Sequence, residues 1–257
     1  MTSYEQLIIT CQTNSDIPPP YEHFYILSVT ENPVYLTLSY KQEYTGREGI
    51  SEEDLLDEGF TTNDNFDWSG SLNTVWKKQL EALYEQSKKL PAPPDTNEDY
   101  VIELKSISKE GNEVISYVAD RDIQKWTYLL QELKQAIYEV EKYEAPMMIK
   151  YLSITEKGSK FATLKGSFAE RSFTVRVDDS PIESFDWGKL QEVVRMIFLN
   201  TEIDEEQEIK GTPTKSGKYI LLPESNWFEL GKAVIDINPK GKTVQKIINT
   251  LESLTGN

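Results

Sequence analysis

One histidine, His23, and one cysteine, Cys11, are the residues of this chain with the widest chemical repertoire. A Ser-His-Asp or Cys-His arrangement would have to use His23, because the chain has no second imidazole to serve as the base. For the same reason, neither a pair of zinc-binding histidines nor a zinc site built from cysteines can form within one chain. Cys11 ends an apolar run, which predicts a buried and unreactive thiol. We expect His23 to be a surface or hydrogen-bonded residue, and we predict no catalytic residue, metal site or cofactor.

Carboxylates are plentiful, and two groups of neighbours are the candidates for acid chemistry. They are the pair Asp178-Asp179 and the cluster Glu52-Glu53-Asp54. Paired acids can hydrolyse a glycosidic bond or bind a hard cation such as calcium. Successive side chains in an extended segment point apart, however, and acidic loops are normally solvated. We therefore expect both groups to be surface features without catalytic function.

The segment Gly211–Lys218 resembles a phosphate-binding loop in composition. Five residues separate Gly211 from Gly217 where the P-loop requires four, and Tyr219 stands where a magnesium-binding serine or threonine should be. Pro213 and the strand expected next also contradict the strand–loop–helix setting that directs backbone N–H groups at phosphate. The segment is predicted to be a loop or part of a hairpin.

The overall charge is strongly negative, with 43 acidic and 27 basic residues among 257 and a formal net charge of −16. Such a charge disfavours binding to nucleic acid or to an anionic membrane through a positive field. It serves solubility, and it can also offer a negative face to a basic protein partner. No run approaches the roughly 18 apolar residues of a membrane helix, and the amino-terminal residues do not resemble a signal peptide. We expect a cytoplasmic protein.

Two acidic segments, 52–58 and 202–208, are the candidate surfaces for such a partner. The residues that we single out in them are Glu52, Glu53, Asp54, Glu205 and Glu206. A tryptophan beside a predicted loop, Trp227, is the candidate aromatic anchor, because interface hot spots are enriched in tryptophan.

A repeated tripeptide indicates how the chain is organised. Phe66-Asp67-Trp68 recurs 119 residues later as Phe185-Asp186-Trp187, and an amphipathic run follows each copy. Aspartate is a favoured N-cap, so Asp67 and Asp186 are predicted to begin two helices, of which the first extends to about Lys89. The recurring Trp68 and Trp187 are predicted to anchor these helices in the core.

Further matches follow the same order along the chain. They pair 35–38 with 151–154, 100–102 with 219–221, 111–115 with 231–235, and 123–125 with 244–246. These matches predict an internal duplication, with one copy over residues 1–143 and the second over 144–257. The duplication further predicts that Trp126, which aligns with Ile247, and Trp76 lie in the core.

The fold class predicted for both copies is α+β. Runs of short strands with hairpin spacing, including a turn at Asn32-Pro33, indicate antiparallel sheets covered by helices. Each copy is predicted in the order β-β-β-α-β-β-α, with the two copies packed as a pseudo-dimer. The predicted helix that starts near Asp120 has apolar residues at helical spacing from Ile123 to Val140.

From that helix onward the predicted order is α-βββ-α-ββ-α, which resembles that of the small acidic chaperones of type III secretion. The resemblance covers element order and acidity, and the first copy departs from it by opening on strands and prolines. It implies a dimer-like body that wraps an extended client. Such an analogy concerns the fold, whereas function depends on sites.

Two hypotheses on function follow. The first is a protein without enzymatic activity that binds another protein, as a chaperone, an adaptor or an inhibitor of a basic partner. The second is a small-molecule sensor or a carboxylate-based enzyme with a pocket between the two copies. An exposed apolar groove rimmed by acids favours the first hypothesis, and a closed polar pocket favours the second.

Overall fold

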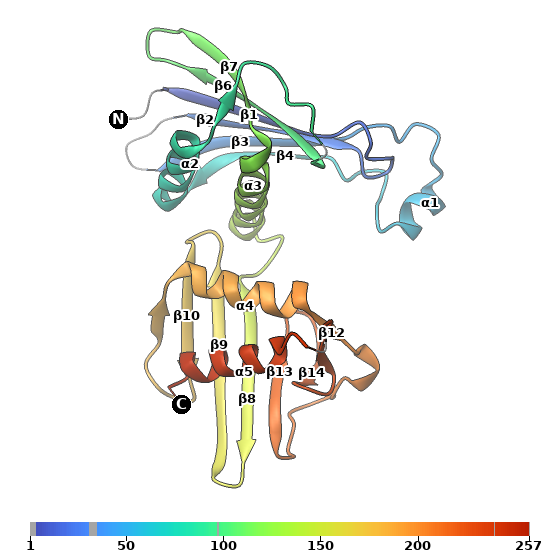
Figure 1. The fold of residues 1–257 in the computed structure, drawn as a ribbon, viewed down its shortest axis with the longest axis vertical. Coiled ribbons are helices and arrows are strands. Elements are labelled where there is room, and N and C mark those ends of the chain that lie inside the picture. Colours follow the sequence, from blue (N-terminus) through green and yellow to red (C-terminus); the bar gives the residue numbers. More distant parts are fainter. Residues whose placement is uncertain (1–3, 31–34, 97, 239, 257) are drawn as a thin grey trace. The chain divides into compact units, whose positions relative to one another are not determined.

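The chain divides into two compact units, unit 1 over Met1–Ile137 and unit 2 over Tyr138–Asn257. The computed structural model describes residues 4–30, 35–96, 98–238 and 240–256. Both units combine antiparallel sheets with helices, so the predicted α+β class is confirmed (Figure 1). The turn predicted at Asn32-Pro33 lies outside the described residues.

Unit 1 is built on a seven-stranded antiparallel sheet in the order β4-β3-β2-β1-β6-β7-β5. Figure 1 shows α2 and α3 on the same side of this sheet. Its elements are β1 (Gln6–Thr13), β2 (His23–Thr30), β3 (Leu36–Tyr44), α1 (Glu52–Asp57), β4 (Phe66–Leu72), α2 (Thr74–Gln86), β5 (Lys89–Leu90), β6 (Tyr100–Ile107), β7 (Glu113–Val118) and α3 (Asp120–Val140), whose last turn enters unit 2.

Unit 2 contains a six-stranded antiparallel sheet in the order β11-β10-β9-β8-β13-β14 and a small two-stranded sheet of β12 and β15. The helices α4 and α5 lie side by side across one face of the larger sheet (Figure 1). Its elements are β8 (Met147–Thr155), β9 (Gly158–Ser167), β10 (Ser172–Val177), β11 (Glu183–Phe185), α4 (Trp187–Asn200), β12 (Thr201–Ile203), the 3-10 turn η1 (Glu205–Gln207), β13 (Gly217–Leu221), β14 (Trp227–Glu229), β15 (Val234–Asp236) and α5 (Thr243–Leu254).

Alternation of apolar residues positions the central strand of unit 1. Leu7, Ile9 and Cys11 of β1 are fully buried, whereas the residues between them are partly exposed. Successive strand side chains point to opposite faces, so these three define the face that the helices cover. The helix α3 presents an apolar face in the same way. Its apolar positions from Ile123 to Ile137 are buried, as their helical spacing predicts.

The helix predicted to begin at Asp67 begins later. Asp67 lies in β4, and α2 starts at Thr74, where the side chain of the N-cap Asn73 accepts a hydrogen bond from the backbone N–H of Val75 at 3.0 Å. Trp68 lies opposite Tyr40 of β3, so its buried side chain belongs to a strand and not to a helix. The run Ser69-Gly70-Ser71 is poor helix-forming sequence, which leaves pairing with β3 as the better use of its backbone groups. Asp186, by contrast, caps α4 as predicted and accepts from the N–H of Gly188 at 2.8 Å.

The predicted order β-β-β-α-β-β-α has five strands in each copy, whereas the described residues form seven strands in unit 1 and eight in unit 2. Both β4 and the three-residue β11 precede the first long helix of their sheet, so the main order is β-β-β-β-α-β-β-α. Both lie at the edge of their sheet, where one side of the strand has no partner strand. Edge strands are commonly short, and β11 has too few residues for a recognisable alternating pattern.

Only some of the sequence matches lie at equivalent positions in the two units. Tyr100–Ile102 and Tyr219–Leu221 lie in β6 and β13, which pair with the central strands β1 and β8, respectively. The matched pair 123–125 and 244–246 lies in the first turns of α3 and α5. Residues 36–38 and 151–154, however, lie in β3 and β8, which occupy different positions in their sheets. The predicted superposition of Trp68 on Trp187 is wrong in detail, because one is in a strand and the other in a helix.

Trp187 is 8% exposed, so its predicted burial is confirmed. Its ring meets that of Phe168 edge to face, with centroids 5.2 Å apart, and it belongs to the core that α4 and α5 form with the sheet. Trp76 and Trp126 are fully buried in unit 1, as predicted, and Ile247 is fully buried in unit 2. The indole N–H of Trp126 donates to the hydroxyl of Ser87 at 2.8 Å, which satisfies the only polar group of that ring.

We predict that Trp187→Ala destabilises the protein by about 3–5 kcal/mol, because it empties a large aromatic site that the neighbouring side chains cannot refill. Denaturant titration measures the effect. Phe198→Ala on the same helix is the matched control, since Phe198 is 47% exposed. A loss of less than about 1 kcal/mol for Trp187→Ala would contradict an anchoring role.

Candidate functional site

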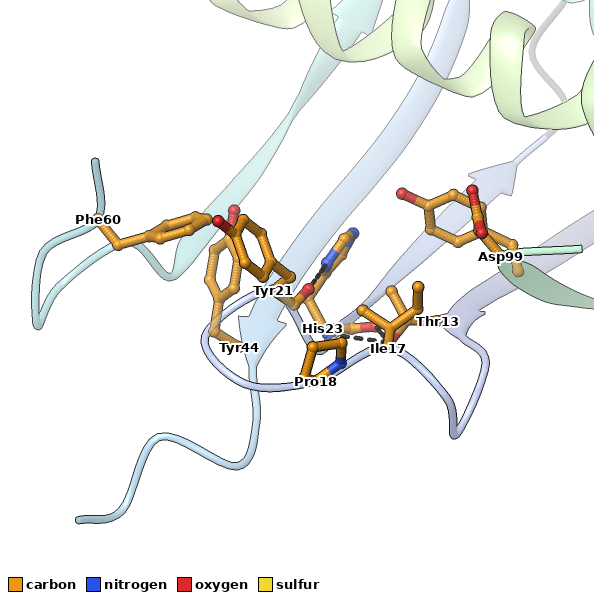
Figure 2. Close-up of a pocket in the computed structure, with 9 residues that line it drawn as sticks. Thr13, Ile17, Pro18, Tyr21, His23, Tyr44, Phe60 and Asp99 are labelled. Carbon is orange, nitrogen blue, oxygen red and sulfur yellow. Dashed lines mark hydrogen bonds between the residues drawn. The ribbon is translucent and has the colours of Figure 1, made fainter. Parts of the chain in front are cut away.

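A pocket of about 450 Å³ opens at the end of the unit 1 sheet where β1 and β3 end and β2 and β6 begin. The strand register creates it, since Thr13 is opposite Tyr100 and His23 is opposite Tyr44. The pocket is lined by Thr13, Ile17, Pro18, Tyr21, His23, Tyr44, Phe60, Asp99 and Tyr100. Figure 2 shows Tyr21, Tyr44 and Phe60 on one side, Asp99 on the other and His23 between them. We call this site the aromatic pocket.

The rings of the aromatic pocket contact one another in a connected series. The His23 ring is 5.4 Å from that of Tyr44 and 5.9 Å from that of Tyr100, centroid to centroid. Phe60 meets Tyr44 at 5.6 Å and Tyr21 at 5.3 Å, both edge to face. These separations lie in the range of favourable aromatic pairs, so the rings support one another around the open volume.

The protonation state of His23 follows from its contacts. Its Nδ1 lies 2.7 Å from the carbonyl oxygen of Tyr21, and because that oxygen can only accept, Nδ1 carries the proton. Burial lowers the pKa of His23, and the positive charges of Lys134 and Arg47 act in the same direction, against the opposing effect of the Tyr21 carbonyl. The imidazole is therefore neutral near pH 7 and presents Nε2 as a hydrogen-bond acceptor.

Arg47 fixes the loop between β3 and β4 against the pocket wall. Its guanidinium carbon is 3.8 Å from the ring centroid of Tyr44 and 4.5 Å from that of Phe60. It donates to the carboxylate of Asp64 at 2.8 Å and to the Pro20 carbonyl at 3.0 Å. Stacking and hydrogen bonding from one planar cation hold two segments and two rings in place.

The first acidic cluster lies in this same loop. Glu52, Glu53 and Asp54 form the first turn of α1 and are exposed, with Ser51 as the N-cap. Farther along the loop, the hydroxyl of Tyr21 donates to the carboxylate of Glu58. Of the acidic segment 52–58, Glu58 thus contacts a residue that lines the aromatic pocket, and the loop that carries it also carries Phe60.

The second acidic segment is held at both ends by backbone bonds within unit 2. At one end the N–H of Asp204 donates to Ala233 at 2.8 Å, beside the pairing of β12 with β15. At the other end the N–H of Ile209 donates to the Trp227 carbonyl at 2.8 Å. Glu205 and Glu206 stand exposed between these two anchors. The structure therefore brings three predicted residues, Glu205, Glu206 and Trp227, into one region.

The predicted exposure of Trp227 is wrong, since its side chain is 5% exposed. It forms a small second core with Leu152 and Tyr219, on which Phe161 and Ile209 also pack. Ile209, which directly follows the acidic segment, pairs with Trp227 and packs on this core. The indole therefore stabilises the segment and offers no surface to a partner.

Exposed apolar residues lie next to the acidic segment. Phe198 and Leu199, 47% and 69% exposed, end α4 immediately before β12. Ile235 is 39% exposed and lies opposite Glu202 in the β12–β15 pair, and Ile237 follows at 60%. We call these four residues, together with Glu202, Asp204, Glu205 and Glu206, the acidic–apolar surface.

The remaining chemical candidates have structural roles. Burial raises the pKa of Cys11 to about 12, which makes the thiol inert at neutral pH. Asp178 accepts from the N–H of Phe161 at 3.1 Å, and residues 211–216 form a loop before β13. Within the described ranges, no three histidine, cysteine, aspartate or glutamate side chains gather closely enough to hold a metal ion. None of the helices in the described part of the chain has both the length and the apolar character needed to cross a bilayer.

Comparison with protein-family models, with curated proteins and with solved structures finds no match to this chain. The aromatic pocket and the acidic–apolar surface are therefore the features from which a function can be inferred. Sequence reasoning missed the pocket because its residues come from four strand ends and three loops. The available indication was that His23 lies among aromatic residues close to a run of prolines.

We predict that the imidazole of His23 titrates below its ordinary pKa of 6.5, because burial and two nearby cations disfavour its protonated form. The unfolded chain then binds more protons between the two pKa values, so stability is full above pH 6.5 and falls as the pH drops toward the folded-state pKa. A proton NMR titration follows the one imidazole without overlap. Lys134→Gln should raise the midpoint, and a wild-type midpoint at or above 6.5 would contradict the prediction.

Proposed function

We propose that this chain is a non-catalytic protein-binding module, of the chaperone, adaptor or inhibitor kind, that holds a basic amphipathic segment of its partner on the acidic–apolar surface. The observation that carries the proposal is the exposure of Phe198, Leu199 and Ile237 beside an acidic segment that backbone bonds hold in place. Exposed apolar residues that cluster and are rimmed by charge are typical of interaction surfaces. A rigid segment also loses little conformational entropy when it binds.

Charge supports a basic partner. Between Thr201 and Lys210 the chain carries five acidic side chains and one basic one, and the whole chain has a formal net charge of −16. That basic residue, Lys210, lies 3.9 Å from Glu208. Among the ion pairs of the described residues, none involves Glu205 or Glu206. An amphipathic segment with lysine or arginine on one face and apolar residues on the other complements such a surface.

As part of the same proposal, the two units derive from one duplicated ancestor. The common strand order of the two larger sheets supports this, as does the shared pattern of buried positions that begins at Ile123 in α3 and at Val244 in α5. The pseudo-dimer packing predicted from the sequence stays a prediction. A cytoplasmic site of action is proposed with it, since a chain with one buried thiol needs no oxidising compartment.

The proposal is tested with a synthetic helical peptide that has lysine on one face and leucine on the other. We expect it to bind, and its association rate should fall roughly tenfold as salt rises from about 0.01 M to about 0.1 M, where the Debye length shortens from about 30 to about 10 Å. The double variant Glu205→Gln, Glu206→Gln should slow association at low salt to a similar degree, because it removes the attracting charge. Surface plasmon resonance measures both rates.

The matched control is Glu52→Gln, Glu53→Gln, which removes the same charge from unit 1. Phe198→Ser should mainly accelerate dissociation, because it removes apolar contact rather than long-range attraction. Equal effects of the two double variants would show that only net charge matters. Peptide binding that is indifferent to salt would contradict an electrostatic role of the acidic segment.

A further inference from the structure

We propose that the aromatic pocket of unit 1 is a binding site for a planar aromatic group that carries a hydrogen-bond donor on its edge, the chemistry of an indole. This site is separate from the acidic–apolar surface of unit 2, and it would give the chain a second binding activity. The observations that carry it are the open volume of about 450 Å³, the rings around it and two hydrogen-bond acceptors that face it.

The walls match a flat apolar group. A volume of this size lies within the range of small-ligand sites, which combine apolar walls with a few polar groups that set orientation. Tyr21, Tyr44, Phe60 and Tyr100 present ring faces and edges, and a flat guest can join their edge-to-face series. Arg47 and the contacts among the rings hold three of these side chains in position, so the pocket exists before the ligand binds.

The polar groups match a donor. His23 uses Nδ1 on the Tyr21 carbonyl, and no described residue hydrogen-bonds to its Nε2. The carboxylate of Asp99 lines the opposite side and accepts no hydrogen bond from the described residues (Figure 2). Both groups accept hydrogen bonds, so a guest with an N–H on its edge is favoured over one that offers only acceptors.

A cationic guest fits less well. Arg47 lies over the rings of Tyr44 and Phe60, so a positive charge already stands against two residues of the pocket wall. Lys134 and Arg47 also place positive charge near His23. The pocket is therefore matched to a neutral aromatic group, in contrast to the acidic–apolar surface, which is matched to positive charge.

Indole and 1-methylindole are the probes, with the full-length chain observed by proton–nitrogen correlation NMR. We expect indole to shift resonances around the aromatic pocket and to bind roughly tenfold more tightly than 1-methylindole, which lacks the N–H. In His23→Phe the wall stays aromatic but the acceptor is lost, so the preference for indole should shrink severalfold. We compare the ratio of the indole and 1-methylindole affinities between the two proteins. Any steric effect of the methyl group cancels in this comparison, because the same two probes are used with both proteins.

Asp99→Asn is the second variant and keeps the test usable if His23→Phe does not fold. It replaces the carboxylate by an amide of the same shape and should weaken indole binding while it leaves 1-methylindole unchanged. Equal affinities of the two probes for the wild-type protein would overturn the proposal, and so would shifts that do not map to the pocket. Glu205→Gln, Glu206→Gln should leave indole binding unaltered, so failure here is distinguishable from failure of the proposed function.

Two sources could supply this chemistry, a free small molecule or a tryptophan side chain of a protein segment. N-acetyltryptophanamide and a tryptophan-containing peptide distinguish them. If the peptide binds much more tightly than the amide, the pocket recognises a tryptophan residue within a polypeptide chain. If the two bind equally, the ring alone is recognised, and both outcomes require the same donor and acceptor pairing.

Discussion

The register of β1 against its two neighbours is the constraint on which the candidate site of unit 1 depends. β1 pairs with β6 through Thr13 and Tyr100, and with β2 up to Gln12 and Phe24. Where that ladder ends, the hydroxyl of Thr13 accepts the N–H of His23 at 3.1 Å and so continues the pairing by one step. A slip of one residue would turn Leu7, Ile9 and Cys11 out of the core and would separate the rings of the pocket. Burial of the central strand thus specifies the geometry of a site at its end.

A second set of bonds joins helices to segments outside them. The buried carboxylate of Asp122 accepts from Lys125 at 2.9 Å and from the N–H of Lys88 at 3.0 Å, and these hydrogen bonds lower its pKa to about 2. In unit 2, Asp236 accepts from the N–H of Val244 at 2.8 Å and caps α5, whose own N-cap residue makes no side-chain bond. Asp236 satisfies a helix N–H that would otherwise lack a partner, whereas Asp122 ties the start of α3 to the loop after α2. The second of them also fixes β15, on which part of the acidic–apolar surface stands.

Local sequence patterns predicted the elements in which buried residues recur at regular spacing. They failed where pairing with a distant strand determines the secondary structure or the exposure of a residue. The spacing from Ile123 to Ile137 predicted α3, and Asp186 was recognised as an N-cap because its partner lies two residues away. Trp68 follows the same tripeptide, yet pairing with β3 holds it in a strand, and no local pattern reveals that partner. Trp227 lies beside a loop in the sequence, yet packing with Leu152 and Tyr219 buries it. The aromatic pocket escaped notice because the strand register, not sequence proximity, brings its rings together.

In the proposed function, the acidity of the chain selects the partner of the acidic–apolar surface. Exposed apolar residues such as Leu199 and Ile237 would by themselves favour association with any apolar surface, a second copy of this chain included. Two copies would, however, bring Glu202, Glu205 and Glu206 of each chain against those of the other, and like charges brought together are unfavourable. The same acids attract a basic segment. In the proposed function, negative charge at the rim therefore disfavours self-association and favours a basic partner, so the apolar residues supply affinity while the acids supply specificity.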